Sequence, residues 1–354
     1  MDAALLQVPL VGMEVEQFVL LLITALAGGA FGAALGALPA FVFTGFVVFL
    51  GEGLAILQRE VAALGGLDGA ELAVGVTGVI GFGAVTGPHV AFAGGVAASA
   101  YAGKKHPEME PDGWDYHFGK DILYAFGTKP DILAVGAVFG AVGMLINQVG
   151  AGIGTPTDTI ALSVVATAFL ARLAFGYPLV GTAAGDGLLD MSPFERGETR
   201  VVTDGGVERE RLATEPWLPH QYQWPGVAAV GLVGGILGGY IWIQTGSVFL
   251  GYAISAMSLL FLNLGVEKIP VTHHITLIGS VGAVVVAPVA GSVAALLAAG
   301  AFGAVSGLLG ELTQRVFYAH SGTHVDPPAM AITVAMLVVA VLAAIGVLPN
   351  AGYL

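Results

Sequence analysis

Two similar segments of the sequence place histidine near threonine at the start of an apolar stretch. The first contains Thr86 and His89, and the second contains Thr272, His273 and His274. A helix that begins inside a protein presents free N–H groups and the positive end of its dipole, which bind anions or carboxylates. Histidine at such a place tunes the binding or relays protons. The simpler interpretation is a pair of ordinary helix starts capped by threonine, with histidine hydrogen-bonded at the membrane surface.

A second pair of similar segments places aspartate at the start of an apolar stretch. Thr155 and Asp158 occur in the first segment, and Thr323, His324 and Asp326 occur in the second. Aspartate is a preferred N-cap residue because its carboxylate accepts hydrogen bonds from first-turn N–H groups, and capping alone would account for both aspartates. The functional alternative is a pair of symmetry-related carboxylates that hold Na⁺ or a proton.

Other reactive chemistry is sparse in the sequence. Glu52 lies between two glycines in a long apolar stretch and is a further candidate for binding an ion. His273 and His274 are adjacent rather than four residues apart, so a divalent metal site would need His320 and His324 to converge with them. We therefore predict neither a metal nor a cofactor. The chain has no cysteine and no Ser-His-Asp, Walker A or His-Glu-x-x-His arrangement, so we do not expect an enzyme.

The composition indicates the environment in which these residues lie. Of the 354 residues, 56% are hydrophobic and 10% are charged, whereas a soluble domain carries about 25% charged residues. The apolar residues form long runs, which predicts an all-α, polytopic membrane protein in contact with the lipid bilayer. The 54 glycines allow membrane helices to pack closely. A net charge of −13 is typical of a halophile and argues against nucleic acid or anionic lipid surfaces as partners.

Hydropathy predicts about eleven membrane-spanning helices, with ten as the close alternative. The expected spans are 17–35, 39–58, 69–86, 88–103, 131–148, 157–176, 226–243, 247–265, 272–290, 292–312 and 328–347. With eleven spans and the N-terminus inside, all 12 Lys and Arg residues fall on the inside, as the positive-inside rule requires. Ten spans with the N-terminus outside leave Arg59 alone on the wrong side. We therefore expect a multi-pass protein of the cell membrane with its N-terminus inside and its C-terminus outside.

Comparison of the sequence with itself indicates an internal repeat. The histidine segments recur with His89 aligned on His274, and the aspartate segments recur later in the chain. Between them, the glycine-containing segment 138–143 resembles 301–306. Three blocks in the same order favour a duplication over chance similarity.

The repeat divides the chain into four parts. We expect an N-terminal segment with the first helix (1–38), a first five-helix repeat (39–176) with a polar loop at 104–130, a cytoplasmic polar linker (177–225) and a second five-helix repeat (226–354). Because five is an odd number, the second repeat enters the membrane in the opposite sense to the first. Such inverted repeats are typical of secondary transporters, whose binding sites lie between the repeats.

The leading hypothesis is therefore a secondary transporter that moves a small ion or solute by alternating access. The second is a channel or passive facilitator, for which glycine-rich helices form a narrow apolar pore in a homo-oligomer. The third is a non-transporting scaffold subunit, in which the polar segments only cap helices and no cavity exists. Transport is favoured if the histidine and aspartate segments of both repeats face one central cavity.

Overall fold

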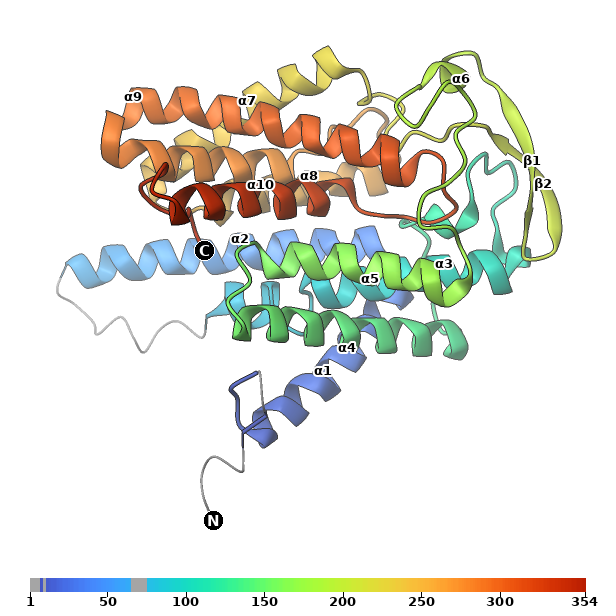
Figure 1. The fold of residues 1–354 in the computed structure, drawn as a ribbon. Helices are drawn as coiled ribbons and strands as arrows, with labels where there is room; N and C mark the ends of the chain where they lie inside the picture. The colour runs from blue at the N-terminus through green and yellow to red at the C-terminus, as the bar shows by residue number, and fades with distance from the viewer. Residues whose placement is uncertain (1–6, 9–10, 65–74) are drawn as a thin grey trace.

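The computed structural model describes residues 7–8, 11–64 and 75–354, and most of these are helical (Figure 1). The first half contains α1 (Val15–Leu35), α2 (Ala37–Ala63), the π-helical turns η3 (Thr77–Gly81) and η4 (Pro88–Phe92), α3 (Ala93–Lys105), the 3₁₀ turns η5 (Pro107–Met109) and η6 (Phe118–Lys120), α4 (Pro130–Gly152) and α5 (Thr159–Phe175). The second half contains α7 (Trp224–Thr245), α8 (Phe249–Asn263), α9 (His273–Thr313), the π-helical turn η7 (Gln314–Tyr318) and α10 (Pro327–Ala344). Between the halves lie α6 (Ser192–Glu195) and the strands β1 (Thr199–Asp204) and β2 (Val207–Leu212).

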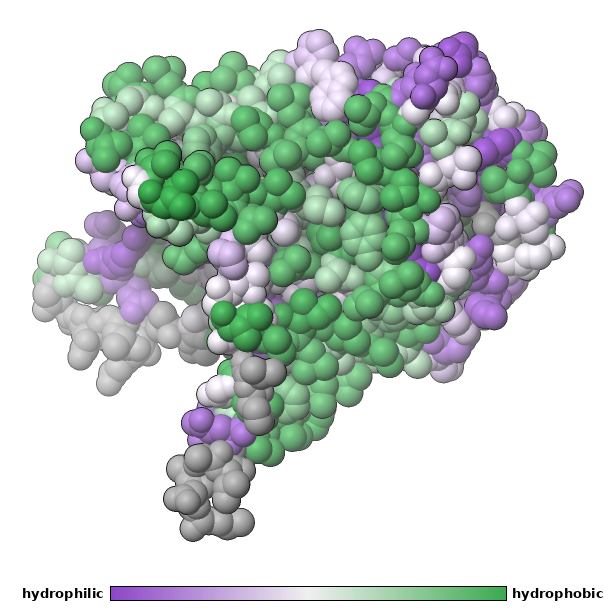
Figure 2. All heavy atoms as spheres, in the orientation of Figure 1, coloured by the Kyte–Doolittle hydropathy of each residue, from purple (hydrophilic) through white to green (hydrophobic). Residues whose placement is uncertain are grey.

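Several helices have the length and apolar character of membrane spans. Among the described residues there are 6 of these, namely α1, α2, α4, α7, α10 and the run of α9 and η7. The helices α5 and α8 are apolar but shorter. Apolar side chains cover the middle of the molecule in Figure 2, which fits contact with lipid. The mostly helical fold and its 6 apolar helices fit the predicted helical membrane protein, whereas the count of eleven spans stays a prediction.

The helix α9 is a hairpin of two arms (Figure 1). Gly291 breaks the helix with a φ of 76° and a ψ of 176°, a conformation that glycine adopts readily. Ser306 on the second arm donates a hydrogen bond of 3.1 Å to the carbonyl oxygen of His274 on the first arm. A straight helix would separate these residues by about 48 Å. The break lies where the sequence predicts the end of one span and the start of the next.

The predicted span at 69–86 is not a membrane-length helix in its described part, and its first residues lie outside the described ranges. From Gly75 onward the chain forms η3 and then turns as far as Gly87. Glycines recur through this segment, and they have a low helix propensity. Pro88 also disfavours a helical backbone at the residue before it. Residues 75–87 therefore lead into the helix made of η4 and α3 instead of forming a separate span.

The linker between the halves contains an exception to the all-α prediction. The strands β1 and β2 pair antiparallel, with Thr199 opposite Leu212. The N–H of Leu212 donates to the carbonyl of Asp115 at 3.0 Å, and Arg211 forms an ion pair of 2.7 Å with Glu110. The linker thus packs on the polar loop 104–130, and the two segments form one hydrophilic end of the molecule, seen in Figure 2. We call it the polar end.

Glycines bring helices into close contact in the same way in both halves. A Cβ atom at Gly29 of α1 would lie 2.2 Å from the carbonyl oxygen of Gly136 on α4. A Cβ atom at Gly235 of α7 would lie 2.3 Å from the carbonyl oxygen of Ala299 on the second arm of α9. The backbones are therefore too close for any larger residue at these points. The pair α1 and α4 packs like the pair α7 and α9.

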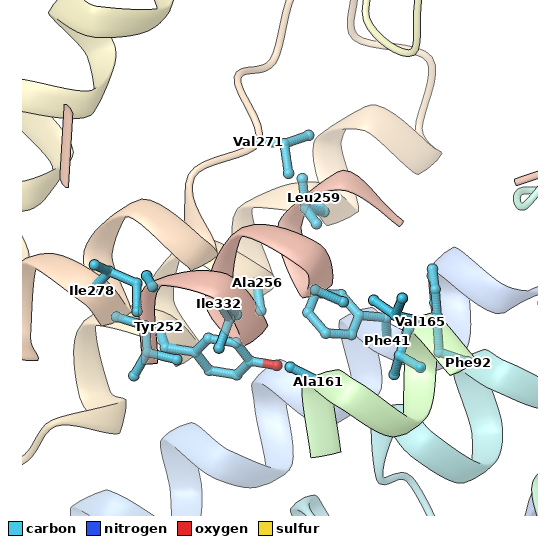
Figure 3. Close-up of a cluster of buried hydrophobic side chains, with 14 of the residues drawn as sticks. Phe41, Phe92, Ala161, Val165, Tyr252, Ala256, Leu259, Val271, Ile278 and Ile332 are labelled. Carbon is cyan, nitrogen blue, oxygen red and sulfur yellow. The ribbon is translucent and has the colours of Figure 1, made fainter. Parts of the chain in front are cut away.

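A hydrophobic core joins the two halves. Figure 3 shows Phe41 of α2, Val165 of α5, Tyr252 of α8 and Ile332 of α10 gathered in one cluster. The rings of Phe41 and Tyr252 meet edge to face, with centroids 6.0 Å apart. Side chains from both halves are thus buried together, and several of them also border a cavity.

Candidate functional site

The helices α5 and α10 run antiparallel and are staggered along each other (Figure 1). The Thr157 hydroxyl, just before α5, donates 2.6 Å to the carbonyl of Thr333 in the second turn of α10. At the other end of α5, Nε of Arg172 donates 2.8 Å to the Thr323 hydroxyl, which precedes α10. The helix α5 therefore begins beside the second turn of α10, and the segment that leads into α10 lies beside the last turn of α5.

An aspartate caps each of these two helix starts with the same geometry. Oδ1 of Asp158 accepts a hydrogen bond of 2.8 Å from the N–H of Ala161, and Oδ2 of Asp326 accepts one of 2.8 Å from the N–H of Ala329. The predicted N-caps are confirmed. Each carboxylate also holds a second donor with its other oxygen. The Tyr353 hydroxyl lies 2.7 Å from Asp158, and Nε2 of His324 lies 3.1 Å from Asp326.

Both aspartates line one cavity of about 890 Å³ between the two halves. Its walls include aromatic rings from both halves, among them Phe41, Phe92 and Tyr252. A cavity of this size, mostly apolar with a few polar groups, is of the kind that binds small molecules. Pro88 and His273 also line it. Four helices therefore begin at the cavity, namely η4 with α3, α5, α9 and α10.

The chain matches the sequence model of a family over residues 10–354, and that family is described as a family of unknown function, DUF7973. The chain belongs to this family. No curated protein and no solved structure matches it. Its function is therefore inferred from the cavity and from the residues around it.

The histidines that line the cavity are not the pair that recurs in the sequence. His273 faces the cavity wall, with its ring centroid 4.7 Å from that of Phe41. His324 lines the cavity as well. His89 and His274 are buried at helix contacts. The neighbouring Pro88 and His273 line the cavity in place of His89 and His274, because adjacent residues on a helix point about 100° apart.

The backbone explains why His89 and His274 occupy equivalent places. The carbonyl oxygen of His89 lies against Gly143, where a Cβ atom would approach it to 1.7 Å. The carbonyl oxygen of His274 accepts the hydrogen bond from Ser306, which the sequence aligns with Gly143. The recurring histidine marks a packing contact in each half.

The four threonines that the sequence singles out do not line the cavity. Thr86 donates to the carbonyl of Ile80 at 2.8 Å, and the N-cap of the following helix is Gly87. Thr272 occupies the N-cap position of α9 without a side-chain cap hydrogen bond. The expected threonine caps are therefore wrong.

The other two threonines belong to the structural frame. The N–H of Thr155 donates 2.9 Å to the carbonyl of Gly150 in the turn before α5. The Thr323 hydroxyl accepts a hydrogen bond from the buried Arg172, whose guanidinium also donates to the Thr323 carbonyl. Arg172 thereby fixes the segment that leads into α10.

Glu52 lies apart from the central cavity. Its carboxylate accepts 2.9 Å from the Thr77 hydroxyl and 2.5 Å from the Ser247 hydroxyl. It borders a separate hollow of about 390 Å³ together with Arg59. Arg59 donates 2.7 Å to the carbonyl of Thr245 at the end of α7, away from the polar end. Glu52 therefore joins α2, η3 and the start of α8 rather than contributing to the site of the two aspartates.

The histidines of the second half do not converge on a metal site. His320 has Nε2 3.1 Å from the carbonyl of Leu188 in the linker, and His324 pairs with Asp326. Within the described ranges, no group of three or more His, Cys, Asp or Glu side chains is arranged to hold a metal ion.

A buried ion pair at the polar end was not predicted from the sequence. Nζ of Lys120 lies 2.7 Å from Oε2 of Glu215, with both side chains 0% exposed. Lys120 also lines the cavity, and Nδ1 of His117 lies 2.5 Å from Oε1 of Glu215. Burial lowers the pKa of Lys120 to about 8, although Glu215 opposes this shift. Burial alone would raise the pKa of Glu215, but Lys120 and His117 outweigh it and lower that pKa to about 2.

Proposed function

We propose that this protein is a secondary transporter that moves a small ion or solute across the membrane by alternating access. The observation that carries this proposal is that Asp158 and Asp326, which cap two antiparallel helices, line the same cavity. Helices that begin near the middle of a membrane protein are the usual binding elements of secondary transporters. A scaffold subunit would not need such a cavity.

We propose further that the two halves are inverted repeats. The first comprises α1, α2, η4 with α3, α4 and α5, and the second comprises α7, α8, the two arms of α9 and α10. The matching glycine contacts of Gly29 and Gly235 support this pairing. So do Gly36 and Gly246, which end α1 and α7 with positive φ values of 94° and 67°. In this proposal the first repeat begins at α1, so it starts earlier than the 39–176 unit predicted from the sequence.

Two five-helix repeats make ten passes, and the positive-inside rule then gives the orientation. Lys and Arg residues lie in or beside the polar end, with Arg59 as the exception. The polar end is therefore cytoplasmic in the proposed orientation. The start of α1 and the end of α10 both lie at the opposite end of the bundle, and so outside. This proposal replaces the inside location predicted for the N-terminus.

Cysteine labelling tests this orientation, and the native chain contributes no cysteine background. Glu195→Cys lies at the exposed polar end, and Ile345→Cys replaces a side chain that is 67% exposed just after α10. In sealed right-side-out vesicles, an impermeant thiol reagent is expected to label position 345 and to reach position 195 only after lysis. Labelling of both positions from one side would contradict the proposed ten-pass topology.

Transport is tested by flux into proteoliposomes with a panel of labelled amino acids, organic acids, amines and inorganic ions. Asp158→Asn and Asp326→Asn remove a charge from the cavity but keep an N-cap, because asparagine caps as well as aspartate. We expect at least tenfold slower uptake of the transported solute in each variant. Gly53→Ala, at a position with no atom within 4 Å of the new Cβ, is the matched control. If both aspartate variants took up the solute at the wild-type rate, the two aspartates would act only as helix caps.

A further inference from the structure

We infer that His324 and Asp326 form a proton-binding site that couples transport to the proton gradient. This inference rests on the proposed transport function and specifies its driving ion. It concerns the start of α10 alone, where Nε2 of His324 lies 3.1 Å from Oδ1 of Asp326 and both residues line the cavity. His324 is 1% exposed.

The hydrogen bonds of the pair leave one nitrogen of the imidazole for a proton. An ionised carboxylate only accepts hydrogen bonds, so Nε2 carries the hydrogen and Nδ1 is the acceptor in the neutral ring. Nδ1 of His324 is buried and has no hydrogen-bond partner among the described residues. Oδ2 of Asp326 is held by the N–H of Ala329. The carboxylate is therefore held in place, and the lone pair that can accept a proton lies on Nδ1 of His324.

The proton transfer is a simple addition at this nitrogen. A proton donated by water binds Nδ1 when the transport cycle opens this buried position, and it converts the neutral ring to an imidazolium while Nε2–H remains hydrogen-bonded to Asp326. The carboxylate stabilises the positive ring by their ion pair. Loss of the proton from Nδ1 to water on the other side of the membrane restores the neutral ring. Each cycle thus carries one proton, and the net charge of the pair changes between −1 and 0.

The surroundings of the two aspartates favour a proton over a metal cation. Hard cations are bound by shells of oxygen ligands. Asp158 and Asp326 are instead surrounded by hydrogen-bond donors, namely two backbone N–H groups, the Tyr353 hydroxyl and the His324 ring. Donors of this kind compete with a cation for the carboxylate oxygens, whereas they hold a protonatable ring in place.

The two repeats differ at this site. The sequence aligns His324 with Pro156, so the start of α5 has no imidazole beside its aspartate. Asp158 is paired with a tyrosine from the C-terminal segment. Histidine is the side chain that ordinarily changes charge between pH 5 and 8. Only the second repeat therefore carries a protonatable partner, and Asp158 provides a matched comparison.

Charged and titratable groups surround the pair on every packed element. They are Tyr318 of η7, with its ring centroid 5.4 Å from that of His324, Arg172 of α5 through Thr323, Lys120 of the polar loop beyond the Tyr318 ring, and His273 of α9 and Tyr252 of α8 across the cavity. The guanidinium of Arg172 is saturated by hydrogen bonds, several of them to carbonyls. The ammonium of Lys120 is paired with Glu215. Arg172 and Lys120 thus have other partners, and neither is hydrogen-bonded to the carboxylate of Asp326 in the described structure.

A direct test uses the full chain in lipid nanodiscs with ring-¹⁵N histidine. The chain has 8 histidines, so the His324 signals are assigned from their loss in His324→Gln. We expect the Nδ1 signal of His324 to move from the neutral to the protonated position between pH 9 and 4.5, with a midpoint that changes in Asp326→Asn. Asp158→Asn should leave that midpoint in place. A His324 ring that stays neutral over the whole range would overturn the inference, whether or not the protein transports a solute.

A flux test separates coupling from transport. Proteoliposomes that contain the pH dye pyranine are given each member of the solute panel. Wild-type protein should acidify or alkalise the lumen together with solute uptake. His324→Gln should lose the change in lumenal pH that accompanies solute uptake by the wild type. Solute uptake without proton movement and without an effect of His324→Gln would support the transport function but contradict its coupling to protons. Absence of any solute flux would contradict the proposed function, and the nanodisc titration would still decide the proton site.

Discussion

The hydroxyl of Ser306 donates a hydrogen bond of 3.1 Å to the carbonyl oxygen of His274, from the second arm of α9 to the first. The equivalent contact in the first half joins Gly143 of α4 to the carbonyl of His89 at the start of η4. The second half thus makes this contact through a hydrogen bond. The first half makes it through a glycine, whose missing side chain lets the two backbones approach closely. Both solutions bring a helix start against a neighbouring helix at the same place in the fold.

This relationship predicts different costs for two small substitutions. Gly143→Ala places a Cβ atom 1.7 Å from the His89 carbonyl oxygen, and we expect this overpacking to cost about 1–3 kcal/mol. Ser306→Ala removes one hydrogen bond, for which we expect a loss of about 0.5–1.5 kcal/mol. The measurement is unfolding of the purified protein in detergent. Gly53→Ala, with open space around the new methyl group, should be neutral or slightly stabilising. Equal stability of Gly143→Ala and Gly53→Ala would contradict the close contact.

The helix caps predict a pattern that separates structure from charge. Asp158→Ala and Asp326→Ala remove the hydrogen bonds to Ala161 and Ala329, and the loss of the cap alone should lower the free energy of unfolding by about 0.5–2 kcal/mol. The corresponding asparagine variants retain a cap and should be more stable than the alanine variants. The same unfolding assay measures both pairs. If alanine and asparagine variants were equally stable, the carboxylates would not act as caps.

Much of this fold follows from the sequence because the bilayer imposes long apolar runs. The helix ends near Asp158 and Asp326, and the break at Gly291, are visible from capping residues and hydropathy alone. Which face of each helix meets the cavity is not visible. In helices that are apolar all round, periodicity does not mark an inner face. Hydropathy therefore does not distinguish His273, which lines the cavity, from His89, which is buried at a helix contact.

Contacts between distant segments also leave no local pattern. Lys120 and Glu215 look like solvated charges of two polar loops, yet they pair in a buried place. Tyr353 looks like a terminal residue, yet it reaches Asp158. The segment 75–87 is apolar enough to suggest a span, but its glycines and the following proline keep it from forming one. Hydropathy records burial in lipid, whereas these features depend on which segments meet.

The hydrogen bond from Tyr353 to Asp158 predicts that the C-terminal segment stabilises the cavity. Hydrogen bonds to charged groups contribute about 1.5–3 kcal/mol, so Tyr353→Phe should destabilise the protein by that order in detergent. Tyr240→Phe is the matched control, since its side chain is 52% exposed. Removal of the hydroxyl also frees Oδ2 of Asp158 toward the cavity. The same melting temperature in both variants would show that the bond contributes nothing.

The ion pair of Lys120 and Glu215 makes stability sensitive to acid. Burial alone would raise the pKa of Glu215, but Lys120 and His117 lower it from 4.5 to about 2. The unfolded chain therefore binds this proton more readily than the folded protein does. The resulting stabilisation is fully present above pH 4.5 and is lost as the pH falls towards 2. We expect a decrease of about 2–4 kcal/mol over this window, measured by unfolding at stepped pH. The double variant Lys120→Met with Glu215→Gln should have a shallower pH profile.

The exposed pair of Arg196 and Glu198, with side chains 57% and 44% exposed, supplies the comparison. Solvent-exposed ion pairs contribute little to stability. The double variant Arg196→Met with Glu198→Gln should therefore keep the wild-type slope between pH 4.5 and 2. A slope shared by the wild type and the Lys120/Glu215 double variant would show that the buried pair does not produce the acid sensitivity. If the slope flattens only when the buried pair is removed, the acid sensitivity is assigned to Glu215. That carboxylate is the group whose proton affinity the pair lowers.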